Sequence, residues 1–258
     1  MTSPAGDRKI QARRILSLID LTNLNNECTT DDVVNLCRRA RGPFGSTAAV
    51  CIWPRFVTIA RSTLDTLRAQ DSRTAGPDIH VATVVNFPAG GTDIAAVMAE
   101  TQQALRDGAD EIDCVVPYRS LLNGDFETPS RLIDEVHRLV TSQAHLKVIL
   151  ETGELGDEEM VTSAARLAID NGADFIKTST GKTAVSATPL AARWMLEVIA
   201  AADRPVGFKP SGGIRTVEEA LIYLELADEI MGSNWASPET FRFGASGLLD
   251  SVEAVLAG

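Results

Sequence analysis

Short apolar runs rich in β-branched residues recur along the chain at a steady interval, and that interval restricts the possible folds more than any other feature. Eight runs begin about 29 to 36 residues apart, close to the length of a strand–helix–strand unit. Each run is short enough to be one buried strand. The eight predicted strands are Leu18–Leu21, Ala48–Ile52, His80–Asn86, Glu111–Val115, Leu146–Glu151, Phe175–Thr178, Val206–Lys209 and Arg242–Ala245.

Helical patterns fill most of the intervals between these strands. Thr92 can cap a helix that ends near Gly108, and Thr29 or Thr30 can cap another. Thr216 is followed three positions later by a glutamate, the pattern of a capping box. Alternating strands and helices imply a parallel sheet, and eight such units favour an α/β fold of the (β/α)8 TIM barrel type. A doubly wound open sheet is the alternative. We expect a single domain over residues 1–258, with a short N-terminal helical extension.

The composition excludes several classes of function. The 258 residues carry a net charge of −11, which argues against broad binding to nucleic acid or to anionic membranes. The four cysteines have no CxxC spacing, and with three histidines they offer no zinc site, so we expect neither a metal nor another cofactor. The N-terminal segment lacks an apolar signal region, and no apolar run reaches the roughly 18 residues that span a bilayer. We expect a cytoplasmic location.

In a barrel, the carboxyl ends of the strands meet at one mouth, where barrel enzymes carry their chemistry. Four successive strands, the fourth to the seventh, each supply an ionisable side chain there, which is unusual for buried strands. The full set of predicted strand-end residues is Asp20, Cys51, Asn86, Asp113, Glu151, Lys177, Lys209 and Ser246.

The lysines are few and concentrated. The chain has five lysines against nineteen arginines, and three of the five lie in two glycine-rich strand-end motifs. Lys177 and Lys209 end adjacent predicted strands about 4.8 Å apart, where each positive charge disfavours protonation of the other. One of them could then be a free amine able to form a Schiff base, with Asp113 transferring protons. The alternatives are solvated loop lysines placed by chance, or a structural Lys177–Asp113 ion pair, which leaves the second lysine unexplained.

Glycine-rich loops follow the sixth, seventh and eighth predicted strands. Glycine lets backbone N–H groups approach an anion, and barrels commonly bind phosphate at the loops after strands seven and eight. We expect Lys182 to bind phosphate rather than to act in catalysis. The segment around Lys182 lacks the first glycine of a P-loop, since position 176 is Ile, so nucleotide hydrolysis is rejected. The candidate phosphate-binding residues are Gly181, Lys182, Gly212, Gly213, Ile214, Arg215, Gly244 and Ser246.

Other polar and aromatic residues receive structural interpretations. Cys51 is interpreted as a filler of the barrel interior that could also meet an aldehyde, and Glu151 as a partner of a lysine. The histidines and tryptophans are expected to lie away from the mouth or to serve packing: His80, His137, His145, Trp53, Trp194 and Trp235.

Taken together, several motifs make the chain similar, from about residue 10 onward, to the deoxyribose-phosphate aldolase family. They are Asp20-Leu-Thr-Asn-Leu-Asn, Val84-Val-Asn-Phe-Pro88, Glu111-Ile-Asp-Cys-Val-Val-Pro-Tyr118, Leu150-Glu-Thr-Gly153, Lys177-Thr-Ser-Thr-Gly-Lys182, Lys209-Pro-Ser-Gly-Gly-Ile-Arg215 and Arg242-Phe-Gly-Ala-Ser246.

The resemblance implies a metal-free class I aldolase that reversibly cleaves 2-deoxy-D-ribose 5-phosphate to acetaldehyde and D-glyceraldehyde 3-phosphate. It implies that Lys177 is the Schiff-base nucleophile, that Lys209 lowers the pKa of Lys177 and assists proton transfer, and that Asp113 exchanges protons with them. Sugar phosphate and aldehydes would be the partners, and a homodimer or homotetramer is expected. The candidate substrate-binding residues are Asp20, Thr22, Cys51 and Thr180.

The chain departs from the family pattern at several positions. Gly247 stands where many relatives have a second serine, Ser211 replaces a common alanine, Trp53 replaces a smaller aromatic, and the chain ends without the terminal tyrosine of some relatives. Three alternatives stay open: a class I aldolase for another sugar phosphate, a non-enzymatic phosphosugar-binding barrel, and a metal-dependent aldolase, which the lack of a histidine cluster disfavours.

Overall fold

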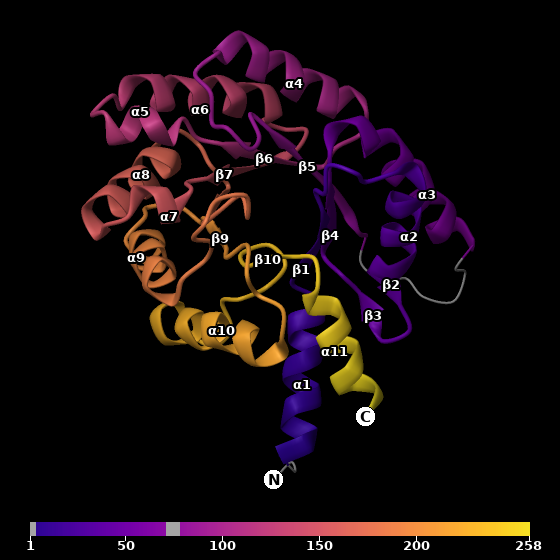
Figure 1. Ribbon diagram of the computed structural model, residues 1–258. Coiled ribbons are helices and arrows are strands. Elements are labelled where there is room, and N and C mark those ends of the chain that lie inside the picture. The colour runs from indigo at the N-terminus through magenta and orange to yellow at the C-terminus, as the bar shows by residue number, and fades with distance from the viewer. Residues whose placement is uncertain (1–3, 71–77) are drawn as a thin grey trace.

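The computed structural model describes residues 4–70 and 78–258, and eight parallel strands of this part surround a central axis (Figure 1). Hydrogen-bonded neighbours run in the order β10-β1-β4-β5-β6-β7-β8-β9. Parallel bridges from Phe208 to Phe241 and from Ser211 to Gly244 link the two ends of this order. The prediction of a (β/α)8 barrel is therefore confirmed. The strands are β1 (Ile19–Asn23), β4 (Ala49–Ile52), β5 (His80–Val85), β6 (Glu111–Val115), β7 (His145–Ile149), β8 (Phe175–Lys177), β9 (Gly207–Lys209) and β10 (Phe243–Ala245).

The barrel strands are buried on both faces because helices cover the outside and side chains fill the inside. Every residue of β4, β6, β8, β9 and β10 is buried. Each predicted strand falls on an observed one. The bounds agree for β6 and differ by one or two residues elsewhere, as is usual where a strand passes into a loop.

The helices form a ring around the strands (Figure 1). Their bounds are α1 (Pro4–Leu16), α2 (Thr30–Ala40), α3 (Val57–Gln70), α4 (Ile94–Arg106), α5 (Tyr118–Leu122), α6 (Glu127–Val140), α7 (Thr152–Leu155), α8 (Glu158–Asp170), α9 (Pro189–Ala200), α10 (Val217–Met231) and α11 (Leu248–Ala257), with a 3-10 turn at Pro54–Phe56. None of those in the described ranges is long and apolar enough to cross a membrane.

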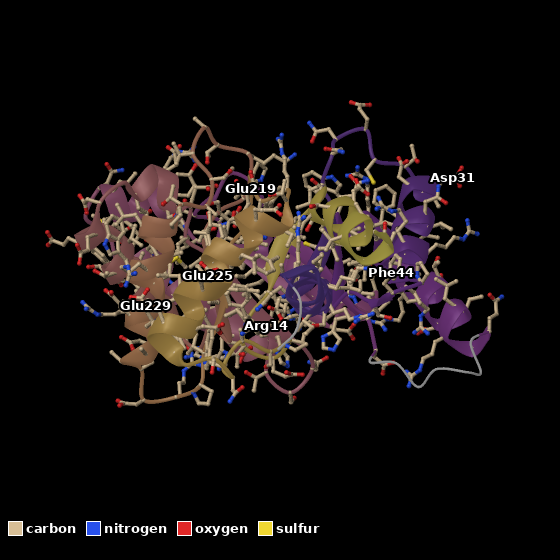
Figure 2. The ribbon with its side chains drawn as sticks, turned by 90° about the horizontal axis from the view of Figure 1, so that it is seen from below. Arg14, Asp31, Phe44, Glu219, Glu225 and Glu229 are labelled. Atoms are coloured by element: carbon tan, nitrogen blue, oxygen red, sulfur yellow. The ribbon has the colours of Figure 1, made fainter. Side chains whose placement is uncertain are left out.

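The predicted N-terminal helical extension is α1. It lies side by side with α11 near the two chain ends (Figure 1). Arg14 of α1 pairs with Asp228 of α10 through two hydrogen bonds of 2.8 and 2.7 Å, on the side of the molecule seen in Figure 2. Burial of Ala12 and Ile15 against the barrel completes the attachment, so α1 is part of the helical layer.

The helix caps test the sequence interpretation locally. Of the two candidate threonines, Thr29 is the cap of α2 and forms a capping box with Asp32, and Thr30 is the first residue of the helix. The predicted capping box of Thr216 with Glu219 at the start of α10 is present. The prediction for α4 was wrong by one position, because Asp93 rather than Thr92 accepts the hydrogen bond from the third helical residue. A carboxylate at that position also favours the positive end of the helix dipole.

The sequence analysis did not predict a two-stranded antiparallel hairpin, β2 (Arg41–Gly42) and β3 (Gly45–Ser46), which lies between α2 and β4. Its turn carries Phe44, which is partly exposed (Figure 2).

Candidate active site

Lys177 and Lys209 are direct register partners on the neighbouring strands β8 and β9. Register partners in a parallel sheet point to the same face, so both side chains enter the barrel. Asp113 of β6 reaches the same point from across β7. All three are buried, with 2% of Lys177 and none of Lys209 or Asp113 exposed. The structure thus brings together the three residues predicted to be catalytic, whose roles stay predictions.

One oxygen of Asp113 binds both amines. The Nζ atoms of Lys177 and Lys209 each donate to Asp113 Oδ2 over 2.8 Å. The other oxygen, Oδ1, accepts a hydrogen bond of 3.1 Å from Lys147 Nζ. Asp113 therefore receives three charged donors, which fixes the orientation of its carboxylate.

Asp20 lies on the far side of Lys209. Its Oδ2 accepts a hydrogen bond from Lys209, and its Oδ1 accepts one of 2.8 Å from Arg242 Nη1. Asp20 is fully buried, with both oxygens occupied inside the protein. The structure places this predicted substrate-binding residue as a partner of Lys209, and any contact with substrate stays a prediction.

The sequence analysis missed three charged residues of the barrel interior, which are Lys147, Glu111 and Arg242. Lys147 of β7 donates to Glu111 of β6 as well as to Asp113. Arg242 Nη2 donates to Glu111 Oε1 over 2.9 Å, and His80 Nδ1 lies 2.9 Å from the same oxygen. The ion cluster therefore continues from the lysine pair to the strand beginnings. The available signal was the spacing of Glu111 and Asp113, which puts two carboxylates on one face of a buried strand.

The electrostatics of the cluster separate the two lysines. Burial would lower the pKa of Lys209, but the carboxylates of Asp113 and Asp20 outweigh it and hold that pKa above its ordinary value. Burial would raise the pKa of Asp113, but its lysine neighbours hold it well below its ordinary value. Lys209 is therefore a cation beside an anionic Asp113. Lys177 pairs with one carboxylate among the described residues, and Lys209 pairs with two.

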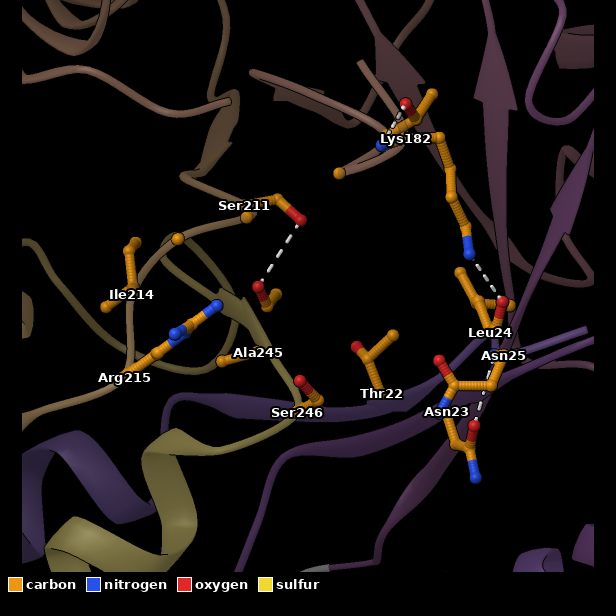
Figure 3. A pocket seen from close by; sticks show the side chains of 15 residues that line it. Thr22, Asn23, Leu24, Asn25, Lys182, Ser211, Ile214, Arg215, Ala245 and Ser246 are labelled. Carbon is orange, nitrogen blue, oxygen red and sulfur yellow. Dashed lines mark hydrogen bonds between the residues drawn. The ribbon is translucent and has the colours of Figure 1, made fainter. Parts of the chain in front are cut away.

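A pocket of about 230 Å³ opens beside the cluster, and Figure 3 shows the side chains around it. Lys182 extends from one side and donates a hydrogen bond of 2.8 Å to the carbonyl of Leu24, while Ile214 and Arg215 lie opposite (Figure 3). All eight candidate phosphate-binding residues line this pocket, together with Thr22 and Thr180. Its full lining is Thr22, Asn23, Leu24, Asn25, Thr180, Gly181, Lys182, Ser211, Gly212, Gly213, Ile214, Arg215, Gly244, Ala245 and Ser246.

Glycines shape the pocket wall. Gly212 and Gly213 adopt consecutive left-handed conformations with φ of 87° and 85°, and the Gly212 N–H donates a hydrogen bond of 3.3 Å to the carbonyl of Gly244. A Cβ atom on Gly244 would lie 2.3 Å from Ser211 Oγ and 3.2 Å from Lys209 Cε. Gly244 therefore joins the pocket wall to the lysine pair, and no larger residue fits there without displacing both side chains.

Two further strand-end residues have clear positions. Cys51 is fully buried in a small apolar cluster inside the barrel, and burial raises the pKa of its thiol. The interpretation of Glu151 as a lysine partner was wrong for the described residues, where its carboxylate instead accepts hydrogen bonds from Thr180 and Thr183. Glu151 thereby holds the loop that carries Lys182.

The histidines lie as the sequence indicated, with His80 and His145 at strand beginnings and His137 in α6. Within residues 4–70 and 78–258, no group of three or more histidine, cysteine or acidic side chains is arranged to hold a metal ion.

Two buried lysines that share one carboxylate, next to a glycine-lined pocket, thus form the candidate active site. Residues 14–251 match the family described as DeoC/LacD family aldolase. The chain belongs to this family. A protein from Agrobacterium fabrum strain C58 named deoxyribose-phosphate aldolase is 54% identical over 245 residues, which are 94% of this chain and 90% of the relative.

Solved structures agree with the family assignment. An apo crystal structure of a candidate deoxyribose-phosphate aldolase from Toxoplasma gondii ME49 superposes with a TM-score of 0.86 at 26% identity, covering 97% of this chain and 98% of that one. A candidate deoxyribose-phosphate aldolase from Coccidioides immitis superposes with a TM-score of 0.80 at 28% identity, covering 94% and 86%. The barrel and its strand order are thus those of DeoC/LacD aldolases.

Proposed function

We propose that this DeoC/LacD aldolase reversibly cleaves 2-deoxy-D-ribose 5-phosphate to acetaldehyde and D-glyceraldehyde 3-phosphate through a Schiff base on Lys177. The observation that carries the proposal is the shared hydrogen-bond acceptor, Asp113 Oδ2, of Lys177 and Lys209. The 54% identical relative of that name supports the choice of substrate.

The nucleophile follows from the two environments. Lys209 has two carboxylate partners and a raised pKa, so it keeps its proton. Lys177 has one carboxylate partner among the described residues, and it shares that partner with Lys209. A free amine is the form that attacks a carbonyl carbon. Lys177 is therefore the nucleophile of the pair.

The reaction then proceeds in four steps. The Lys177 amine adds to C1 of the open-chain sugar and water leaves, which gives an iminium. Asp113, acting through a water molecule, removes the proton of the C3 hydroxyl, and the C2–C3 electron pair moves into the iminium. Glyceraldehyde 3-phosphate leaves with the new carbonyl, and an enamine stays on Lys177. Protonation at C2 and addition of water release acetaldehyde and restore the amine.

Lys209 and the pocket support these steps. The Lys209 ammonium holds positive charge beside Lys177 and assists proton transfer to Asp113. The substrate phosphate binds against Lys182, the backbone at Gly213 and Ser246, which lies just before the N-terminus of α11. Thr22 and Thr180 line the space next to the phosphate and contact the sugar. Asp20 and Cys51, which are buried next to the ion cluster and are not among the residues that line the described pocket, stay candidates for contact with the reacting carbons.

We further propose that residues 1–258 act as one domain in a cytoplasmic homo-oligomer that degrades deoxyribose phosphate. A class I aldolase for another sugar phosphate is the second candidate. The residues around Lys177 would suit Schiff-base cleavage of other open-chain sugars as well.

The test is cleavage of 2-deoxy-D-ribose 5-phosphate, with both aldehydes measured and a panel of other sugar phosphates for comparison. We expect this substrate to be preferred, with activity unaffected by EDTA. Preference for another sugar phosphate of the panel would identify that compound as the substrate instead. Tight binding of sugar phosphates without turnover would make the protein a binding barrel.

A further inference from the structure

Lys147 is a fully buried lysine outside the pocket, in a position that neither the substrate pocket nor the proposed reaction steps use. It lies on β7, between β6 and β8, and is the register partner of Asp113. Its Nζ lies 5.9 Å from the centre of the Phe175 ring. A buried lysine costs free energy unless carboxylates compensate it, so its position needs a reason.

Lys147 and the lysine pair bind different oxygens of Asp113. Lys147 occupies Oδ1 over 3.1 Å, and this leaves Oδ2 to the two lysines of the pair. Glu111 holds Lys147 from the other side. Donors on both oxygens disfavour rotation of the carboxylate, so its plane stays fixed relative to Lys177.

The charges give Lys147 a second effect. Among the described residues, the cluster contains the carboxylates Asp20, Glu111 and Asp113, and the cations Lys147, Lys209 and Arg242 balance them. Lys177 adds a fourth cation beside Asp113. Without Lys147, Glu111 and Asp113 would each lose one of their ion-pair partners in the barrel interior.

We propose that Lys147 is a positioning residue of the aldolase reaction, which fixes Asp113 through Oδ1 and supplies positive charge that keeps the Asp113 carboxylate ionised. The proposal rests on the function proposed above. Lys147 acts through Asp113, and contact with substrate is not part of its role.

The titratable and charged groups around Lys177 come from every side of the barrel. They are Asp20 on β1, Cys51 on β4, His80 on β5, Glu111 and Asp113 on β6, Lys147 on β7, Lys209 on β9 and Arg242 just before β10. Burial would lower the pKa of Lys147, but Asp113 and Glu111 hold it above its ordinary value. Lys147 therefore keeps a constant charge across the working pH range, and changes in that range come from other groups.

The test compares Lys147→Met, Lys147→Arg and wild type in the cleavage of deoxyribose 5-phosphate as a function of pH. Lys147→Met should lower kcat by at least about tenfold and move the acid limb of kcat/KM to higher pH, because Lys147 is one of the cations that hold the pKa of Asp113 below its ordinary value. KM at the optimum should change by less than about threefold, because the phosphate pocket is untouched. Lys147→Arg keeps the charge and should keep the acid limb at the wild-type pH.

Arg14→Met is the matched control, because it removes a half-buried cation from the outer Arg14–Asp228 pair. It should leave kcat and the acid limb unchanged. A folded Lys147→Met enzyme with the wild-type kcat and acid limb would overturn the role of Lys147. Absence of cleavage in the wild-type protein would instead overturn the proposed function.

If Lys147→Met does not fold, the wild-type protein carries the test. The chain has five lysines, so labelling with ε-13C-lysine gives few NMR signals. Substituting each of the other four lysines in turn removes its own signal and so assigns the remaining one to Lys147. Reductive ethylation of Lys177 should shift the Lys147 signal through Asp113 and leave that of Lys9 in place. An unchanged Lys147 signal would refute the coupling.

Discussion

Lys177 and Lys209 are register partners on adjacent strands, and their amines share a single oxygen of Asp113 at 2.8 Å each. Two buried ammonium groups at one acceptor repel one another, and Asp20 compensates that repulsion at Lys209 only. The pair is therefore asymmetric: among the described residues, Lys209 has two carboxylate partners and Lys177 has one. This asymmetry supports the proposal that Lys177 is the nucleophile.

Replacing Lys177 by arginine should abolish turnover. A guanidinium can keep the ion pair with Asp113, but it stays protonated and cannot form a Schiff base. The measurement is release of acetaldehyde from deoxyribose 5-phosphate by a variant whose circular dichroism matches wild type. Measurable turnover by this variant would refute the role of Lys177.

Replacing Asp113 by asparagine should lower kcat by roughly 10²- to 10⁴-fold, the usual contribution of a positioned acid or base. It should also lower the melting temperature, because three lysines lose their shared carboxylate inside the barrel. Steady-state kinetics and thermal unfolding test the two effects separately. A kcat within about threefold of wild type would exclude Asp113 from proton transfer.

Lys182 should act on binding alone. Lys182→Met removes a cation from the pocket and should raise KM for deoxyribose 5-phosphate by about tenfold, with a small change in kcat. Deoxyribose without its phosphate is the control substrate, and its kcat/KM should not change. An equal loss with both substrates would show that Lys182 does something other than bind phosphate.

Gly247 is a position where a substitution should improve both phosphate binding and stability. It caps α11 with φ −108°, and a Cβ atom there would have no heavy atom within 4 Å, so a side chain fits without strain. Gly247→Ser adds a hydroxyl next to Ser246 and should lower KM for the phosphorylated sugar by about two- to fivefold, with a gain of a few tenths of a kcal/mol in stability. Gly247→Ala fills the same space without the hydroxyl and should leave KM unchanged. Equal KM values for the two variants would contradict a phosphate contact at this position.

His80 should make stability depend on pH. Its hydrogen bond to Glu111 raises the pKa of His80, so the folded protein holds the proton more tightly than the unfolded chain. That stabilisation is complete below the unfolded pKa of about 6.5 and is lost as the pH rises through the folded value. The Tm difference between wild type and His80→Asn should therefore be larger near pH 5.5 than near pH 8.5. His145→Asn, at an exposed strand beginning, is the control and should show no such trend; the same trend in both variants would contradict the account.

The barrel could be predicted because each strand-helix unit carries its own local signals. Apolar runs such as Glu111–Val115 and caps such as Thr216 are readable within a few residues. The errors are local as well. Asp93 displaced Thr92 because both can cap, and the choice depends on where the chain turns after β5. The β2–β3 hairpin has strands of two residues, too short for a period to appear.

The strand-end residues could be predicted, but the extension of the ion cluster into the barrel interior through Lys147, Glu111 and Arg242 could not. Lys177 and Lys209 were identified because they end their strands; Asp113 was also taken as a strand-end residue, but it is the middle residue of β6. Lys147 is the middle residue of β7, and its purpose appears only when β6 and β7 are set in register. The loop contact of Glu151 with Thr180 likewise depends on a left-handed turn at Glu151 that no local pattern announces.

The most direct test of the central claim is borohydride trapping with acetaldehyde, followed by mass spectrometry of the peptides. The account predicts a reduced ethyl adduct on Lys177, formed by the wild-type protein and lost in Lys177→Arg. An adduct on Lys209 instead would reverse the roles of the two lysines, and the absence of any adduct on the folded protein would contradict the Schiff-base mechanism.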